Sequence, residues 1–278
     1  MAQLPWRACD SGSGVAATGS VHYKETRRMN MQPFELIGAD GKRITGDRAD
    51  GATRQILFIT GFLSKRWGNK SKALAQWCQE KGWGFCCYDV RGFGDSEGQF
   101  TDYTLSDWIA DARTVVKLIG AGPPVTIVGN SLGSWIAWLV AQEFSVVEEL
   151  ILIAPAFNMM GERAKTIPKE RLHDWHTAGW MPWDNDPVHR DWPLSWTWVE
   201  ESEQYWAKTC DITRHIKTTI LHGQDDIVIS PDGSRQFADE LRRRDPSFPL
   251  DLRLIPGDHR LSSPEHLELF RRLVMREA

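Results

Sequence analysis

The stretch VTIVGNSLGSWIAWLVAQEF, residues 125–144, decides the fold class, because it joins two kinds of element at one sharp turn. Its first five residues have the apolar, β-branched pattern of a buried strand. The residues from Leu132 to Phe144 are mostly apolar, as in a buried helix. Between them, G-N-S-L-G places glycines beside Ser131, where they would relieve the crowding of a strand-to-helix turn. The stretch therefore predicts one unit of an α/β protein.

Short apolar runs alternate with longer helical patterns from residue 32 onward. This alternation predicts a mostly parallel sheet with helices on both faces. We expect eight strands, at residues 34–37, 43–47, 56–60, 84–89, 125–129, 149–154, 218–222 and 250–255. We expect helices at residues 70–81, 105–119, 132–144, 231–243 and 264–276. The last two open with Pro231 and Pro264, which suit a first helical turn.

One span interrupts the alternation. Residues 156–211 separate the sixth and seventh strands by more than a crossover helix needs, and they hold seven of the fourteen tryptophans. We expect them to form a Trp-rich cap inserted into an α/β core of residues 32–155 and 212–278. The rings would form the core of the cap, and some of them could line an apolar substrate pocket.

The composition excludes several classes of protein. The chain has 278 residues, 41% of them hydrophobic, and a net charge of -4 without a basic stripe, so we expect no nucleic-acid partner. No apolar run is long enough for a transmembrane segment. The five cysteines have no zinc-site spacing, and we expect neither a metal nor another cofactor. Residues 1–31 are expected to be a disordered leader in a cytoplasmic protein, or alternatively a mitochondrial transit peptide.

The G-x-S-x-G pattern occurs twice, so the sequence offers two candidate nucleophiles. Ser131 lies between a strand and a helix, which is the context that this chemistry requires. Ser96, in GDSEG, follows a turn-rich loop and precedes a polar segment. Its neighbours Asp95 and Glu97 would oppose a developing oxyanion. We therefore expect Ser131 to be the nucleophile and Ser96 to lie in a structural turn.

A serine nucleophile needs a base and an acid that orients the base. In the α/β-hydrolase order these follow the serine, first the acid and then the histidine, after later strands. Asp226 follows the strand TTILH, with Asp225 and Asp211 as alternative acids, and His259 follows LDLRLI. The competing histidines do not follow the last strand directly, and of these His222 is expected to have a structural role at the end of its strand. They are His22, His173, His176, His189, His215, His222 and His266.

The oxyanion of an acyl-transfer intermediate needs two backbone donors. In this arrangement they come from the residue after the nucleophile and from the loop after the third strand. These positions are Leu132 and Phe62, and Gly61 permits the tight turn that would aim the Phe62 N–H inward. One such donor lowers the barrier by roughly 3 to 4 kcal/mol.

Five segments carry a family resemblance: FITGFLSKRWGNKSKALAQWC, CYDVRGFGDSEGQFTDYTLSDWIADA, GNSLGSWIAW, LHGQDDIVIS and GDHRLSSPEHL. From about residue 34 to 275 the chain resembles the α/β-hydrolase-domain-containing protein ten type and its bacterial relatives. The resemblance implies an esterase or thioesterase acting on acyl esters, including acyl glucuronides and S-acylated proteins. It implies the same Ser131, Asp226 and His259. Thr60 stands where many hydrolases of this fold have histidine, and the cap is the least similar part.

Together these features predict a serine esterase or thioesterase that works through an acyl-enzyme intermediate on a small-molecule or acyl-protein ester. A peptidase of the same fold is the nearest alternative. A non-catalytic ligand receptor on the same fold is an alternative from a different class.

Overall fold

The computed structural model describes residues 30–183 and 192–276. Nearly all of the expected leader therefore lies outside the described residues. The main sheet has eight strands in the order β1-β2-β4-β3-β5-β6-β9-β10. β1 and β2 are antiparallel to their neighbours, and the pairings from β4 to β10 are parallel. The strands are β1 (Gln32–Ile37), β2 (Arg43–Ala49), β3 (Gln55–Ile59), β4 (Gly84–Tyr88), β5 (Val125–Asn130), β6 (Val147–Ile153), β9 (Lys217–Gly223) and β10 (Leu250–Ile255).

The sheet is the predicted one, and its burial explains why the sequence revealed it. Every residue of β3 and β4 is buried, as is most of β5 and β6, because helices cover both faces of these strands. The edge strand β1 has no buried residue and alternates between half-buried and exposed positions in its second half. Continuous apolar runs in the middle of the sheet and alternating ones at its edge are the expected patterns for these two environments.

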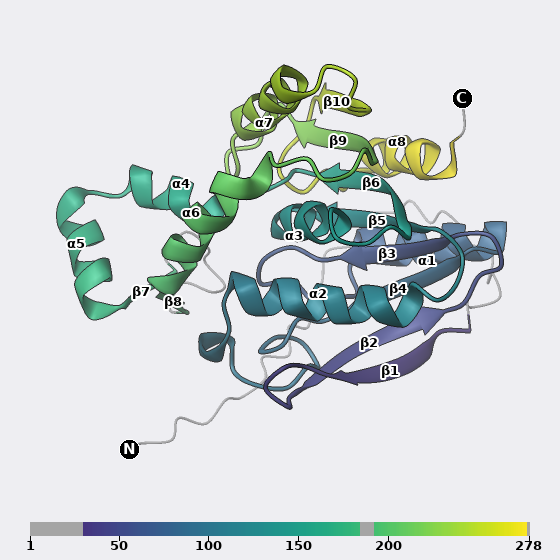
Figure 1. Cartoon of the computed structure of the whole chain (residues 1–278), viewed down its shortest axis with the longest axis horizontal. Helices are drawn as coiled ribbons and strands as arrows, with labels where there is room; N and C mark the ends of the chain where they lie inside the picture. Colours follow the sequence, from purple (N-terminus) through teal and green to yellow (C-terminus); the bar gives the residue numbers. More distant parts are fainter. Residues whose placement is uncertain (1–29, 184–191, 277–278) are drawn as a thin grey trace, which may run out of the picture.

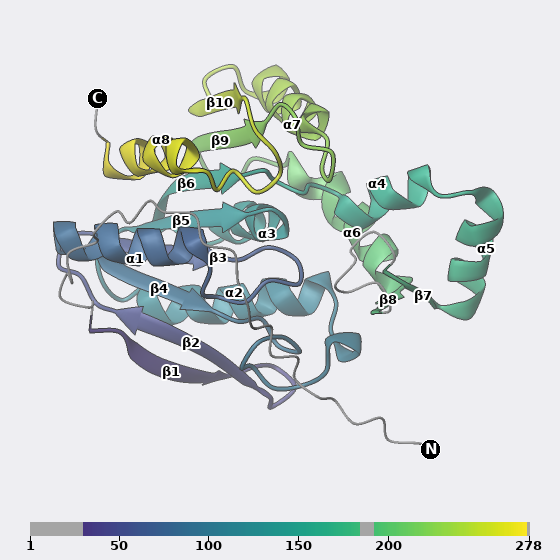
Figure 2. The same ribbon diagram turned by 180° about the vertical axis from the view of Figure 1, so that it is seen from behind.

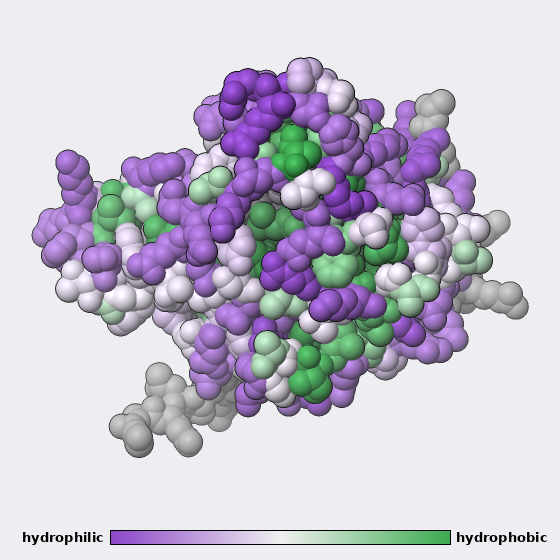
Figure 3. Space-filling model, viewed as in Figure 1, coloured by the Kyte–Doolittle hydropathy of each residue, from purple (hydrophilic) through white to green (hydrophobic). Residues whose placement is uncertain are grey.

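Helices cover the two faces in two groups (Figures 1 and 2). One group contains α2 (Leu105–Ile119), α3 (Leu132–Ala141) and α7 (Pro231–Arg244), whose buried residues share one hydrophobic cluster. The other group contains α1 (Asn69–Lys81) and α8 (Pro264–Met275), which share a second cluster with the opposite face of the sheet. All five were predicted, although α3 ends three residues earlier than expected. The outer surface of α7 is strongly hydrophilic (Figure 3).

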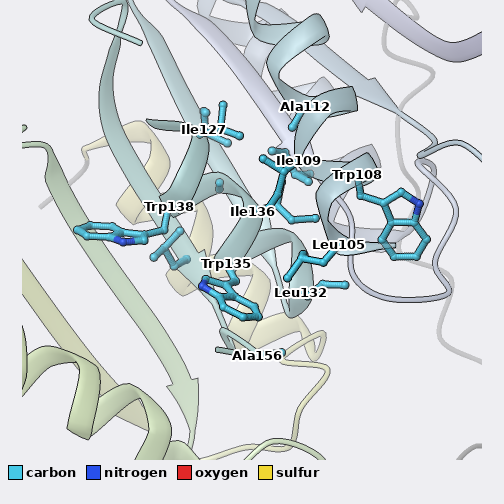
Figure 4. Packing of buried hydrophobic residues seen from close by; sticks show 14 of the residues in the cluster. Leu105, Trp108, Ile109, Ala112, Ile127, Leu132, Trp135, Ile136, Trp138 and Ala156 are labelled. Atoms are coloured by element: carbon cyan, nitrogen blue, oxygen red, sulfur yellow. The ribbon is translucent and has the colours of Figure 1, made fainter. Parts of the chain in front are cut away.

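Helix α3 lies at the centre of the first cluster. Trp135 and Trp138 on this helix are fully buried, and their indole N–H groups donate to the side chain and the carbonyl of Thr209 at 2.9 and 2.7 Å. Figure 4 shows the α3 side chains packing toward residues of α2, such as Ile109. Because these indoles bond to the end of α6 (Thr197–Thr209), the helix that begins after Ser131 is fixed both to the sheet and to the inserted segment.

The segment between β6 and β9 leaves the core at the carboxyl ends of the parallel strands and extends to one side (Figures 1 and 2). It contains α4 (Met159–Thr166), α5 (Lys169–Ala178) and α6 (Thr197–Thr209). It also contains a small antiparallel sheet of β7 (Trp180–Pro182) and β8 (Pro193–Ser195), which was not predicted. Within the described residues, no helix is long and apolar enough to cross a bilayer.

The tryptophans of this segment have different environments. Trp175 and Trp198 are 0% and 1% exposed, as expected for rings that form the core of a cap. Trp180 is 57% exposed, so it contributes little to that core. The buried rings belong to the same hydrophobic cluster as the core, and Trp198 packs on Trp108 of α2 with ring centroids 4.9 Å apart.

Candidate active site

Ser131 lies at the turn between β5 and α3 in a backbone conformation that side chains rarely adopt. Its φ and ψ are 53° and -121°. The turn is held from both sides: the Ser131 N–H donates to the Ile153 carbonyl at 2.8 Å, and the Ser131 carbonyl accepts from Ala156 at 3.2 Å. Such strain persists only where the surroundings enforce it. This conformation makes the side-chain hydroxyl project at the carboxyl edge of the sheet, as the serine of a nucleophile elbow does.

The two glycines of G-N-S-L-G are required by close packing. A Cβ atom at Gly129 would lie 2.4 Å from the Cα of Ser134. A Cβ atom at Gly133 would lie 2.3 Å from the carbonyl oxygens of Ile59 and Thr60, at the end of β3. The glycines thus allow α3 to start directly against its neighbouring strands, and this contact fixes where Ser131 points.

The structure brings three predicted residues together at this turn. The Nε2 atom of His259 lies 3.1 Å from the Ser131 hydroxyl, and Nδ1 lies 2.7 Å from Oδ2 of Asp226. Asp226 follows β9 and His259 follows β10, so three loops at one edge of the sheet supply the set. The His259 side chain is 19% exposed, whereas that of Asp226 is fully buried.

The carboxyl group of Asp226 is held in its ionised form. Burial alone would raise its pKa, but hydrogen bonds from His222 and His259 and from the backbone N–H of Ile229 keep the pKa well below its usual range. The charge is therefore present at neutral pH. A permanent carboxylate beside Nδ1 fixes the ring so that Nε2 can accept a proton.

The sequence predicts that two backbone N–H groups near Ser131 bind the oxyanion. Within the described residues, neither the N–H of Leu132 nor that of Phe62 donates to a protein acceptor. The loop that carries Phe62 packs against Ser131, because a Cβ atom at Gly61 would lie 3.1 Å from the Cβ of Ser131. Both N–H groups therefore remain available as donors, and their role in binding an oxyanion stays a prediction.

The Phe62 ring links this loop to the inserted segment. It contacts Phe100 and Trp108 of the core, with ring centroids 5.7 and 5.8 Å apart. It also contacts Trp183 and Trp198 of the inserted segment, both at 5.5 Å. The position of the Phe62 N–H thus depends on aromatic packing that spans the core and the cap.

Ser96 has the surroundings of a structural residue. Its hydroxyl donates to the Asp89 carbonyl at 2.7 Å and accepts from the Thr45 N–H at 2.8 Å. In the described residues no histidine bonds to it. The turn is tight, since Gly94 and Gly98 have φ values of 64° and 94°. GDSEG therefore joins the loop after β4 to β2.

The alternative acids have other partners. The Asp225 carboxylate accepts from the Gly257 N–H at 3.1 Å, and Asp211 pairs with Arg244 at 2.8 Å. In the described part of the chain, neither forms a hydrogen bond or ion pair with His259, whose partners are Asp226 and Ser131. Of the competing histidines, His22 and His189 lie outside the described residues.

Two side chains with contacts to the site were missed by the sequence reasoning. His222 was interpreted only as the end of its strand, yet its Nε2 atom lies 3.1 Å from Oδ2 of Asp226. Lys70 on α1 was not considered. It is buried, and its ammonium group donates to the Arg260 carbonyl and, at 3.2 Å, to the Ser262 hydroxyl, both in the loop of His259. The spacing of His222 and Asp226 in LHGQDD (residues 221–226) was a signal for the contact of His222. No local signal exists for the contact of Lys70.

The described residues contain no group of three or more His, Cys, Asp or Glu side chains that could hold a metal ion.

Residues 52–251 match the profile of a family of hydrolases described as serine aminopeptidase, S33. The chain belongs to this α/β-hydrolase family.

Similar proteins with curated descriptions agree with this family. The mouse and human proteins named palmitoyl-protein thioesterase ABHD10, mitochondrial, are both 27% identical to the chain over 225 residues. The aligned region covers 80% of this chain and 74% of the mouse protein, and 79% of this chain and 71% of the human protein.

Solved structures of other α/β hydrolases show the same fold. Mouse α/β hydrolase domain-containing protein 10 has a TM-score of 0.79 at 24% identity and covers 88% of this chain and 97% of its own. A putative hydrolase from Agrobacterium vitis S4 has a TM-score of 0.74 at 22% identity, and the match covers 90% of this chain and 99% of that protein's chain. Est1E from Butyrivibrio proteoclasticus, solved with ferulic acid, has a TM-score of 0.70 at 22% identity. The match covers 87% of this chain and 96% of the Est1E chain.

Proposed function

We propose that the protein is a serine hydrolase of carboxylic esters or thioesters, with Ser131 as nucleophile, His259 as base and Asp226 as the orienting acid. The observation that carries the proposal is the chain of contacts at 3.1 and 2.7 Å from the Ser131 hydroxyl through His259 to Asp226. The hydroxyl is activated when the imidazole accepts its proton, and an anionic neighbour is needed to stabilise the imidazolium that results.

The reaction has two steps. The Ser131 oxygen attacks the acyl carbonyl while its proton moves to Nε2 of His259, and that proton then passes to the leaving alcohol or thiol. Water attacks the acyl-enzyme with His259 again as the base, and the acid and free serine result. The N–H groups of Phe62 and Leu132 stabilise the oxyanion in both steps.

The substrate class follows from the surroundings of the oxyanion loop. The Phe62 ring contacts two tryptophans of the cap, so an acyl group bound there would meet aromatic side chains. We propose medium or long acyl chains, or aromatic acids, carried by a small molecule or an acyl-protein. The names of the ABHD10 relatives, which are palmitoyl-protein thioesterases, support the first acyl type, and the ferulic acid bound to Est1E supports the second.

The experiment is a substrate panel on the wild-type protein and on Ser131→Ala. It contains p-nitrophenyl esters from acetate to palmitate, a palmitoyl thioester and an aminoacyl p-nitroanilide. We expect turnover of esters or thioesters by the wild type, with acetate below longer chains, and none by Ser131→Ala. Turnover of the anilide alone would instead support the peptidase that the family description names. A folded wild type that fails to react with a fluorophosphonate probe would favour a receptor.

The location of the protein is part of the same proposal. The names of the curated relatives describe mitochondrial proteins, so they support the mitochondrial alternative and give no support to the cytoplasmic one. Expression of residues 1–31 fused to a fluorescent protein would test this, and diffuse fluorescence in the cytoplasm would contradict it.

A further inference from the structure

The side chain of His222, on β9, is completely buried and has a defined partner at each ring nitrogen. Nδ1 lies 2.7 Å from the hydroxyl of Ser234 on α7. Nε2 lies 3.1 Å from Oδ2 of Asp226 and 3.0 Å from the carbonyl oxygen of Ile229. No step of the proposed reaction uses this histidine.

The partners of His222 determine where its proton lies. Nε2 faces a carboxylate oxygen and a carbonyl oxygen, which only accept hydrogen bonds, so Nε2 must carry a hydrogen. The Ser234 hydroxyl can donate to Nδ1, which then needs no proton of its own. The ring is thus a built-in donor to Asp226.

This donor completes the hydrogen bonding of the Asp226 carboxylate. Oδ1 accepts hydrogen bonds from the backbone N–H groups of Val228 and Ile229 at 2.9 and 2.8 Å. Oδ2 accepts His222 on one side and Nδ1 of His259 on the other. A carboxylate has about four lone-pair sites, so the protein alone occupies them all. The carboxylate plane and the direction of the lone pair toward His259 are therefore fixed.

We propose that His222 is a positioning residue for the reaction: its Nε2–H group directs Oδ2 of Asp226 toward His259. The proposal rests on the function proposed above. His222 also shares Oδ2 with His259, so its hydrogen bond disperses part of the charge that stabilises the His259 imidazolium. Removing it should weaken the alignment of the acid and, at the same time, make protonation of His259 easier.

Two substitutions separate this role from simple filling of space. The amide nitrogen of His222→Gln can reach the place of Nε2 and still donate to Asp226. The shorter side chain of His222→Asn reaches only the place of Nδ1, so it can bond to Ser234 and not to Asp226. We expect kcat/KM of the Asn variant to fall by on the order of tenfold or more, mainly through kcat, and that of the Gln variant to stay close to wild type.

The pH profile of kcat/KM provides a second readout. In His222→Asn the acidic limb of the profile should move to higher pH, whereas His222→Gln should leave it in place. Other charged groups around the His259 loop are the same in both variants. They are Lys70 on α1, Asp225 after β9, Asp258 and Arg260 in the loop itself, and His266 on α8.

The measurements are made on an ester that the wild type hydrolyses, together with thermal unfolding of each variant. Equal loss in the Gln and Asn variants with unmoved acidic limbs would overturn the proposal, because that is the result of a purely structural role. Activity equal to wild type in both would also overturn it. Absence of activity and of fluorophosphonate labelling in the wild type would instead refute the proposed function. If His222→Asn fails to fold, Ser234→Ala tests the same role, because Nδ1 of His222 then loses the hydroxyl that holds the ring in place beside Asp226. In that variant kcat/KM should fall and its acidic limb should move to higher pH, and an unmoved limb would overturn the proposal.

Discussion

Replacement of Asp226 by asparagine should nearly abolish activity while leaving the fold intact. The asparagine oxygen can take the place of Oδ1 and still accept the hydrogen bonds from the backbone N–H groups of Val228 and Ile229. Its NH₂ group then takes the place of Oδ2, 2.7 Å from Nδ1 of His259 and 3.1 Å from Nε2 of His222. His222 can adapt by moving its proton to Nδ1, because the Ser234 hydroxyl can accept as well as donate a hydrogen bond. Because an amide N–H can only donate, Nδ1 must become the acceptor and the proton must move to Nε2. That nitrogen faces Ser131 and can no longer accept its proton.

The expected size of this effect is large. A wrong histidine tautomer in a Ser-His-Asp site lowers kcat by about 10⁴-fold, close to 5 kcal/mol of barrier. The rate of fluorophosphonate labelling should fall in parallel, because it uses the same proton transfer. Steady-state hydrolysis of a p-nitrophenyl ester and labelling by the probe measure the two effects.

Asp225→Asn is the matched control. Asp225 is the neighbouring carboxylate, is exposed, and bonds to the Gly257 N–H instead of to His259. We expect its activity to stay within about threefold of wild type, since an amide oxygen can accept that bond. Activity of Asp226→Asn within tenfold of wild type, or a severe loss in Asp225→Asn alone, would refute the assignment of the acid.

Three further predictions follow from the packing of the site. Gly133→Ala should lower the free energy of unfolding by about 1 to 3 kcal/mol in urea, because the new Cβ would meet the Ile59 and Thr60 carbonyls. Gly233→Ala, in α7, has open space around it and should leave the free energy of unfolding unchanged or raise it by up to about 1 kcal/mol. Burial lowers the pKa of Lys70 from 10.5 to about 8. As the pH rises, Lys70 therefore loses its proton in the folded state at a lower pH than in the unfolded state. The free energy of unfolding of the wild type, relative to that of Lys70→Met, should rise by roughly 2 kcal/mol between about pH 7 and about pH 9.5. A difference that does not change with pH would contradict the burial of a charged ammonium group. Phe62→Ala keeps the backbone donor but loses four ring contacts, and should lower kcat by up to about 10²-fold to 10³-fold; unchanged kcat would show that the ring does not hold the loop.

The sheet and its five helices could be predicted because each has the periodicity of its environment. The runs at β3 and β4 are apolar throughout, since both of their faces are covered. The strands β7 and β8 could not be predicted, because each has three residues and includes a proline. Their pairing depends on the packing of the inserted segment and leaves no periodic pattern.

The order of the site residues along the chain was also predictable, because parallel strands bring the loops after β5, β9 and β10 to one edge. What could not be read from the sequence is the set of contacts that hold these residues in place. Lys70 bonds to the Arg260 carbonyl across 190 positions of sequence. The bond from His222 to Asp226 spans only four positions, but it depends on the turn after β9 and on the rotamers of both side chains.

The choice between the two G-x-S-x-G serines tests the central claim most directly. Ser131→Ala and Ser96→Ala should each be treated with a fluorophosphonate probe beside the wild type, after thermal unfolding has confirmed that all three are folded. Ser131→Ala should show no labelling, and Ser96→Ala should be labelled like the wild type even if its lost bonds to Asp89 and Thr45 lower its melting temperature. Labelling that survives in Ser131→Ala and disappears in a folded Ser96→Ala would contradict the account.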